Sequence, residues 1–345
     1  MILNIQYLNK NTYLFAMANI LVTGGTGFIG TPLVKKLNFL GHNLKLLVRE
    51  NSNTVPFKDL SNIEYVIGDV QDISSLEKAV ENVDIIYHLA AYVPIWAKKK
   101  SLYHDVNVVG TDNIANLALK KNIKFNYVSS FTAIGPTTPE PVDETYEKEN
   151  FSMEYEKSKF HAKWKVKEYI GKGLNATIFY PGIVYGPGDF NIFGQMLYDI
   201  TRGKFLGCPG KGDSIATYSY INDVVDGMVS VIGRDNVSGE DFILGGENIS
   251  FGDYLNLIAE IAGTKKPRHF PMSGAMLYAW MCEIGAKISG KMPYITRPTV
   301  SAIKIHRSYS SEKAINKIGY KITPLREGLT KTIEWYKNFI EKEKL

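Results

Sequence analysis

The sequence predicts an α/β protein with a doubly wound parallel sheet and a smaller lobe after it. Three observations support this fold class. Apolar runs of strand length recur with helical patterns between them, a glycine-rich turn joins the first run to the first helix, and the alternation loosens after residue 187. Strands that alternate with helices are what parallel βαβ units require. Ligands of such sheets bind at the carboxyl ends of the strands.

The predicted strands share an apolar composition and lie at 19–23, 44–48, 63–67, 84–88, 125–129 and 176–180. The predicted organisation has three parts. An N-terminal extension at 1–16 is expected to be disordered, and a dinucleotide-binding domain is predicted at 17–186 with parts of 215–245. A discontinuous substrate-binding lobe is predicted at 187–214 and 246–340. Five aromatic residues are expected either to line the substrate pocket or to pack in the core of the lobe, namely Tyr92, Trp96, Phe190, Phe193 and Tyr198.

The first turn carries glycines at a spacing of three residues, Gly24, Gly27 and Gly30, between an apolar strand and an amphipathic helical pattern. Gly24 permits a tight turn, Gly27 lets the backbone approach a pyrophosphate, and Gly30 lets the helix pack close to the strand. The helix N-terminus offers free N–H groups to phosphates. The spacing alone also fits a plain glycine-rich βα turn.

The second motif is Tyr155 and Lys159, four residues apart on one face of a predicted helix. A free tyrosine has a pKa of about 10, and a nearby cation is expected to lower the pKa of Tyr155. The tyrosine can then exchange a proton with a substrate oxygen. Ser129 and Ser130 end the strand at 125–129, where Ser130 can orient that oxygen. The alternatives are a solvated lysine-rich helix face and serines that satisfy only backbone groups.

Glycine turn, strand-end serine and Tyr-x-x-x-Lys, in that order, resemble the extended short-chain dehydrogenase/reductase family, and most of all its dihydroflavonol reductase-like branch. The resemblance runs from about Met17 to Phe339. Further matching motifs are Gly68-Asp69-Val70, His88-Leu89-Ala90-Ala91, Asn107-Val108-Val109-Gly110-Thr111, Tyr180-Pro181-Gly182 and Tyr185-Gly186-Pro187-Gly188-Asp189.

The resemblance implies a Rossmann-type fold and assigns residues to the site. The implied catalytic residues are Ser130, Tyr155, Lys159 and Asn107. The implied cofactor-binding residues are Gly24, Gly27, Phe28, Ile29, Gly30, Arg49, Asp69, Val70, Leu89, Ala90, Ala91, Ser129, Tyr155, Lys159, Tyr180, Pro181, Gly182 and Ile183.

The residue after the second strand bears on the choice of cofactor. An acid at this strand end binds the ribose 2′-hydroxyl of NAD, whereas an arginine suits the 2′-phosphate of NADP. Arg49 occupies that position, so NADP is favoured. Glu50 follows directly, and a shift of one residue would restore NAD.

Ser130, Tyr155 and Lys159 serve several net reactions in the family, so departures from the family pattern must discriminate between those reactions. The resemblance implies that nucleotide-sugar epimerases of the family bind the diphosphate of their substrate with an asparagine and an arginine. This chain has Ile183 and Ala216 at those two positions. Arg297 and Arg307 are the candidates that could replace the lost diphosphate ligands. Dehydratases carry an Asp-Glu pair where this chain has Phe131 and Thr132. We therefore predict an NAD(P)-dependent carbonyl–alcohol oxidoreductase. A nucleotide-sugar epimerase that retains NAD is the first alternative, and a non-catalytic dinucleotide-binding protein is the second.

Composition constrains the partners. The net charge is only +5 and the lysines are scattered, so we expect a small-molecule substrate and no nucleic acid. Cys208 and Cys282 show no disulfide or zinc spacing, no metal is expected, and a reducing, cytoplasmic location follows. Helices near 105–121 and 153–171 are the surfaces through which many relatives form homodimers.

The segment from Met276 to Ile288 carries an apolar stripe at helical spacing, formed by Leu277, Trp280, Met281, Ile284 and Ile288. We interpret it as a helix packed into the lobe core. The alternatives are a greasy cap over the substrate and a helix that touches a membrane. The segment is too short to span a bilayer, and it carries the charged residues Glu283 and Lys287, so no membrane span is predicted.

Overall fold

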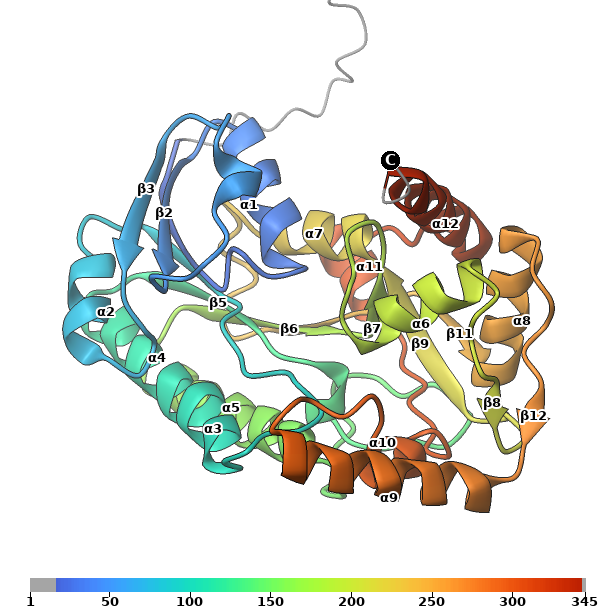
Figure 1. The fold of residues 1–345 in the computed structure, drawn as a ribbon. Helices are drawn as coiled ribbons and strands as arrows, with labels where there is room; N and C mark the ends of the chain where they lie inside the picture. Colours follow the sequence, from blue (N-terminus) through green and yellow to red (C-terminus); the bar gives the residue numbers. More distant parts are fainter. Residues whose placement is uncertain (1–16, 343–345) are drawn as a thin grey trace, which may run out of the picture.

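A seven-stranded sheet runs through the centre of the computed structural model, which describes residues 17–342 (Figure 1). Its strands are β1 (Asn19–Thr23), β2 (Asn43–Val48), β3 (Ile63–Ile67), β4 (Ile85–His88), β5 (Lys124–Val128), β6 (Ala176–Pro181) and β10 (Asp241–Leu244). The order is β10-β6-β5-β4-β1-β2-β3, and every pair is parallel. This confirms the predicted α/β fold, and the six predicted strands agree within one residue.

The direction of winding reverses between β1 and β4, which is where ligands bind in such sheets. Both faces of the sheet are covered, so the strands read as nearly continuous apolar runs. In β1, Ile20 and Val22 pack on one face and Leu21 on the other, all fully buried.

One helical layer contains α2 (Ile73–Ala79), α4 (Gly110–Lys120) and α5 (Glu154–Gly171). The opposite layer contains α1 (Gly30–Phe39), α7 (Ile221–Val229) and α11 (Glu312–Ile318). The predicted helix at 105–121 is irregular, because α3 (Ser101–His104) leads through a π-helical turn at Asp105–Val109 into α4. Single 3₁₀ turns occur at Val55–Phe57 and Phe131–Ala133.

The lobe packs beside the carboxyl end of β6. Its small sheet has the order β11 (Glu247–Ser250), β9 (Ile215–Tyr220) and β7 (Ile183–Tyr185), and it is covered by α6 (Ile192–Thr201), α8 (Phe251–Ala262) and α12 (Leu325–Lys342). Tyr218 and Tyr254 stack with ring centroids 3.7 Å apart. Tyr198 and Phe193 belong to the lobe core, whereas Phe190 contacts Tyr198 and Phe339 from the surface and is 47% exposed.

One strand and one helix differ from what the sequence predicted. Strand β10 lies within 215–245, part of which was assigned to the dinucleotide-binding domain, but it was not among the predicted strands; it forms an edge of the large sheet beside β6. Helix α11 lies within the range assigned to the lobe, but Ala314 and Ile318 pack in the core of the large sheet. The predicted extension at 1–16 lies outside the described residues.

A second pair of strands, β8 (Cys208–Pro209) and β12 (His269–Phe270), leads into α9 (Met272–Ser289) and α10 (Arg297–Ala302) at the lower edge of the molecule (Figure 1). The interpretation that the apolar stripe of α9 packs into the lobe core is wrong. Leu277 is 57% exposed and Ile288 is 83% exposed. The helix is instead buried through Ala275, Ala279 and Ala286, whose small side chains allow close packing. Across residues 17–342, none of the helices combines the length and apolarity that crossing a bilayer would demand.

Candidate active site

The glycine turn between β1 and α1 has the shape of a phosphate cradle. Gly24 has a φ of +71°, and a Cβ there would lie 2.6 Å from the Ala90 nitrogen. A Cβ on Gly30 would collide with the Gly24 carbonyl oxygen, so α1 begins directly against the turn. A Cβ on Gly27 would meet only that same oxygen, at 3.2 Å, which leaves its outer side open. The turn therefore excludes side chains inside and offers backbone outside, as a pyrophosphate requires.

His88, the buried first residue of the His88-Leu89-Ala90-Ala91 motif, connects this turn to α4, a role that the motif alone did not predict. His88 Nδ1 lies 2.7 Å from Thr23 Oγ1, and His88 Nε2 lies 3.0 Å from Thr111 Oγ1. Thr111 donates its own proton to the Asn107 carbonyl, so His88 Nε2 must be the donor and Nδ1 the acceptor. Burial, followed by the charge of Lys159, lowers the pKa of His88 to about 3, so the ring is neutral. The chain of bonds ends at Ala90, whose N–H donates to Thr23 Oγ1 at 3.3 Å.

Asn107, predicted near the active site, lies in the π-helical turn and directs its amide toward the protein. Its Oδ1 accepts from the Tyr92 nitrogen at 2.6 Å, and its Nδ2 donates to the Tyr92 carbonyl and to Ser158 Oγ. Ser158 in turn donates to the Tyr155 carbonyl at 2.8 Å. Asn107 thus ties the loop after β4 to α5, which is a positioning role.

The structure brings Ser130 and Tyr155 together at the end of β5. The Ser130 side chain lies near enough to the Tyr155 hydroxyl to lower the pKa of that phenol. Ser130 Oγ also accepts from the nitrogen and the hydroxyl of Thr132, the latter at 3.0 Å. The sequence analysis treated Thr132 only as a departure from the dehydratase pattern. Its hydroxyl in fact holds Ser130 in place, and the 3₁₀ turn that begins at Phe131 creates this contact.

Lys159 lies one helical turn after Tyr155 and is 3% exposed. Its Nζ donates to the Val128 carbonyl at 3.0 Å and lies 5.2 Å from the centre of the Tyr127 ring. Burial lowers the pKa of Lys159 to about 7. Among the described residues it makes that single hydrogen bond, so two of the three ammonium donors are unused.

The expectation that Lys159 lowers the pKa of Tyr155 is not met in this structure. Burial raises the pKa of Tyr155 to about 12, and the nearby Ser130 hydroxyl opposes this rise only in part. Lys159 is itself buried and only partly protonated near neutral pH, so its charge does not outweigh desolvation. Tyr155 is therefore a neutral phenol at neutral pH, the form that donates a proton.

The remaining predicted cofactor residues fall into two groups by position. Those at the carboxyl ends of β1 to β4 lie around the glycine turn, and they are Phe28, Ile29, Arg49, Asp69, Val70, Leu89, Ala90 and Ala91. Arg49 is exposed directly after β2. Asp69 follows β3, and its Oδ1 accepts from Gln71.

The second group lies at the ends of β5 and β6. Ser129 is buried and donates its N–H to the Phe179 carbonyl at 2.8 Å. Pro181, Gly182 and Ile183 join β6 to β7, and Gly182 lets β9 approach, because a Cβ there would lie 2.6 Å from Ser219 Oγ. The Tyr180 hydroxyl points instead to Asp241, so its side chain does not join the site.

A buried ion pair fixes the first turn of α5, which carries Tyr155. Glu156 accepts from the nitrogen and hydroxyl of Ser152 at 2.7 and 2.9 Å, and its other oxygen pairs with Arg307. Both charges are buried, with 3% and 11% of the side chains exposed. The segment around Arg307 lies along β9, since its N–H donates to the Ile215 carbonyl at 2.8 Å. The pair therefore joins α5 to the lobe.

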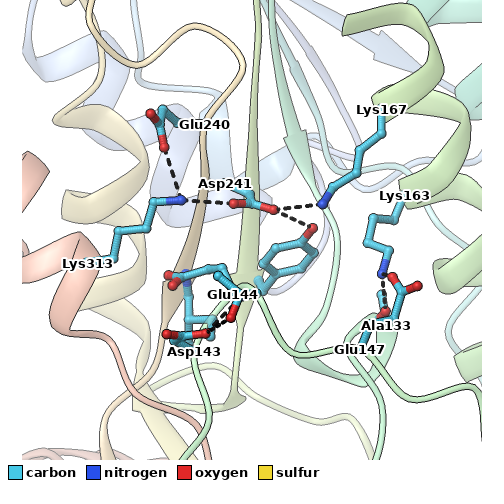
Figure 2. Close-up of polar contacts among 12 residues, drawn as sticks. Ala133, Asp143, Glu144, Glu147, Lys163, Lys167, Glu240, Asp241 and Lys313 are labelled. Atoms are coloured by element: carbon cyan, nitrogen blue, oxygen red, sulfur yellow. Dashed lines mark hydrogen bonds and ion pairs between the residues drawn. The ribbon is translucent and has the colours of Figure 1, made fainter. Parts of the chain in front are cut away.

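A second charged network, shown in Figure 2, holds the middle of α5. Lys163 pairs with Glu147 and donates to the Ala133 carbonyl at 2.9 Å. Lys167 pairs with Asp241 at 3.1 Å, and Asp241 also binds Lys313 at 3.0 Å. Burial would raise the pKa of Asp241, but the two ammonium groups outweigh it and hold that pKa below its usual range. This network clamps α5 to β10 and α11.

The fold, the glycine turn and the Ser130–Tyr155–Lys159 cluster together define a dinucleotide-dependent enzyme of the extended short-chain dehydrogenase/reductase type. Comparison with family profiles matches residues 20–245 to the NAD dependent epimerase/dehydratase family. The chain belongs to that family.

Among curated relatives, a Synechocystis sp. protein with the provisional name dihydroflavonol 4-reductase is 28% identical, over 94% of this chain and 96% of its own length. The sterol demethylase protein B of Methylococcus capsulatus is 30% identical, over 72% of this chain and 76% of its own.

Among solved structures, gox2253 has a TM-score of 0.79 and 33% identity, covering 93% of this chain and 98% of that one. The UDP-glucuronic acid 4-epimerase of Bacillus cereus, in complex with UDP-glucuronic acid and NAD, shares the fold with a TM-score of 0.74 and 20% identity, covering 93% and 99%.

We predict that Lys159→Met stabilises the protein at low pH. The pKa of Lys159 is about 7 in the folded state, below its ordinary 10.5, so the unfolded chain binds more protons between these values. Its contribution to the free energy of unfolding therefore rises as pH increases from about 7 to about 10.5. Urea unfolding across this range should show the largest advantage of the variant at or below pH 7. Lys157→Met, on the exposed side of the same helix, is the control, and parallel curves for wild type and Lys159→Met would contradict the prediction.

We also predict that Arg307→Met lowers the free energy of unfolding by about 3 kcal/mol, because it leaves the Glu156 carboxylate buried without its partner. The double variant Glu156→Gln with Arg307→Met should recover part of this loss, since glutamine can still accept from Ser152. Lys331→Met breaks an exposed pair with Glu327 and should cost less than about 0.5 kcal/mol. An equal loss of unfolding free energy in Arg307→Met and Lys331→Met would contradict the prediction that the buried pair contributes more to stability than the exposed one.

Proposed function

We propose that this protein is an NAD(P)-dependent oxidoreductase that interconverts a carbonyl and a secondary alcohol, with Tyr155 as the acid and base. The observation that carries the proposal is the grouping of three side chains at the end of β5: Ser130 lies near the Tyr155 hydroxyl, and the buried Lys159 follows one helical turn after Tyr155. The glycine turn lies in the same sheet, at the carboxyl end of β1.

The residues divide the chemistry among them. A bound nicotinamide dinucleotide supplies or accepts the hydride. Tyr155, protonated at neutral pH, donates its proton to the carbonyl oxygen in reduction and recovers it in oxidation. Ser130, held by Thr132, orients that oxygen and stabilises the charge that develops on it. Lys159 has two unused donors for the hydroxyls of the nicotinamide ribose.

The diphosphate ligands of a nucleotide-sugar epimerase are the main feature that the site lacks. Ile183 and Ala216 occupy the two positions implied by the resemblance. The arginines that could substitute are already engaged, Arg307 with Glu156 and Arg297 with Glu283. This arrangement favours an oxidoreductase over an epimerase.

An apolar carbonyl compound fits the proposed chemistry best. Tyr92 and Trp96 lie partly buried in the loop after β4, which Asn107 anchors next to α5. A relative is named as a sterol demethylase protein, which agrees with a flat apolar substrate. The lobe at 187–214 and 246–340 is the proposed substrate-binding part. Homodimerisation through α4 and α5 stays a prediction, with Trp164 of α5 46% exposed and Phe160 buried.

We predict that Tyr155→Phe lowers kcat for NADPH-dependent ketone reduction by about 10²- to 10⁴-fold, because the proton donor is lost. Dinucleotide affinity should change little, as measured by fluorescence titration. Tyr169→Phe is the matched control on the same helix, because among residues 17–342 the hydroxyl of Tyr169 hydrogen-bonds only Asp112. A panel of apolar ketones supplies the substrates. Turnover that survives in Tyr155→Phe would exclude the proposed role, and absence of turnover in wild type would favour a non-catalytic binder.

The cofactor proposal is NADP, because Arg49 stands exposed after β2, where a 2′-phosphate would lie. We expect the purified protein to release little dinucleotide on denaturation, by mass spectrometry, and to bind NADP⁺ more tightly than NAD⁺. Arg49→Glu should reduce that preference by roughly tenfold or more, whereas Glu50→Gln should keep it. Near-stoichiometric NAD in the purified protein would contradict both the NADP preference and the oxidoreductase, and would favour an epimerase.

A further inference from the structure

Helix α9 presents an apolar surface to the outside of the molecule, and we propose that this surface docks on an anionic lipid bilayer. The α9 stripe consists of side chains that recur at helical spacing and are exposed by 57%, 46%, 51%, 38% and 83%, namely Leu277, Trp280, Met281, Ile284 and Ile288. Helix α9 lies along the outer edge of the lobe, beside α10 (Figure 1). The proposal uses none of the residues assigned to catalysis.

The two faces of α9 are reversed relative to an ordinary amphipathic surface helix. The face toward the protein is built from Ala275, Ala279 and Ala286 and packs near Val300 of α10. The large apolar side chains point outward instead. The apolar surface continues beyond the helix in Met292, which is 60% exposed. Monomeric proteins rarely expose contiguous apolar patches that have no partner.

The charges around the α9 stripe show what kind of partner fits it. Lys287 and Lys291 are exposed at the end of the helix, and the ammonium of Lys98 lies beside Gly290. The one acid of the helix, Glu283, is neutralised by Arg297 at 2.8 Å and is only 14% exposed. An apolar stripe with lysines at its margin is the arrangement that lies in the interface of an anionic bilayer.

The other end of the helix has the same sign of charge. Lys265, Lys266 and Arg268 are all exposed in the segment that leads into α9. A second copy of the chain would bring basic groups together whether the two helices packed parallel or antiparallel. Like charges brought face to face oppose association, whereas anionic lipid headgroups would neutralise both ends at once. The charge pattern therefore favours a bilayer over a homotypic contact.

The direct test is flotation of the full chain with vesicles of phosphatidylcholine, alone or mixed with phosphatidylglycerol. We expect binding to the mixed vesicles, weakened by salt, with a blue shift of tryptophan emission that Trp280→Phe reduces. The double variant Ile284→Glu with Ile288→Glu should reduce the partition coefficient by about tenfold or more. Lys287→Gln with Lys291→Gln should weaken binding and its salt dependence. Phe39→Glu is the control, since Phe39 is 83% exposed on α1.

Thermal unfolding checks that every variant is folded, which is expected because the substituted side chains are exposed. Equal vesicle binding by wild type and by the Ile284→Glu, Ile288→Glu variant would overturn the proposal. So would failure of wild type to bind the mixed vesicles. A dimer in sedimentation that the same variant dissociates, without vesicle binding, would assign the α9 stripe to a second copy of the chain.

Discussion

The attachment of α5 to the large sheet and to the lobe is the constraint on which the rest of the site depends. Charged side chains along one helix make the attachment, since Glu156 binds Arg307, Lys159 binds the Val128 carbonyl and Lys163 binds the Ala133 carbonyl. Each charge is buried, and a buried charge must keep its partner or lose several kcal/mol. The helix therefore cannot slide or rotate without breaking one of these contacts, which holds Tyr155 against Ser130.

The same burial determines the proton chemistry. Burial raises the pKa of Tyr155 to about 12 and lowers the pKa of Lys159 to about 7, because it disfavours the charged form of each group. A neutral phenol suits proton donation to a carbonyl oxygen. The neutral His88 serves structure, because both ring nitrogens are used between β1 and α4. Desolvation thus keeps both groups uncharged, Tyr155 as the proposed proton donor and His88 as a link between elements.

The lobe adds a feature that the site does not need. The α9 stripe is apolar on the outside because small alanines already satisfy its contact with α10. The α9 stripe lies between two groups of basic residues, and the one acid of the helix, Glu283, is paired with Arg297. An enzyme that acts on apolar carbonyl compounds would gain from such a surface, because those compounds partition into bilayers.

The sequence by itself determined the sheet, since apolar runs such as Ile20 to Val22 suffice to mark strands buried on both faces. It also determined the glycine turn and the pairing of Tyr155 with Lys159, because local spacing places them. Strand β10 escaped prediction, since a short edge strand has little periodicity to read. Only tertiary structure decided the Glu156–Arg307 pair, 151 residues apart, the pKa of Tyr155, and the outward orientation of the α9 stripe. Periodicity shows that a helix has an apolar face, but the packing of distant segments decides whether that face is covered.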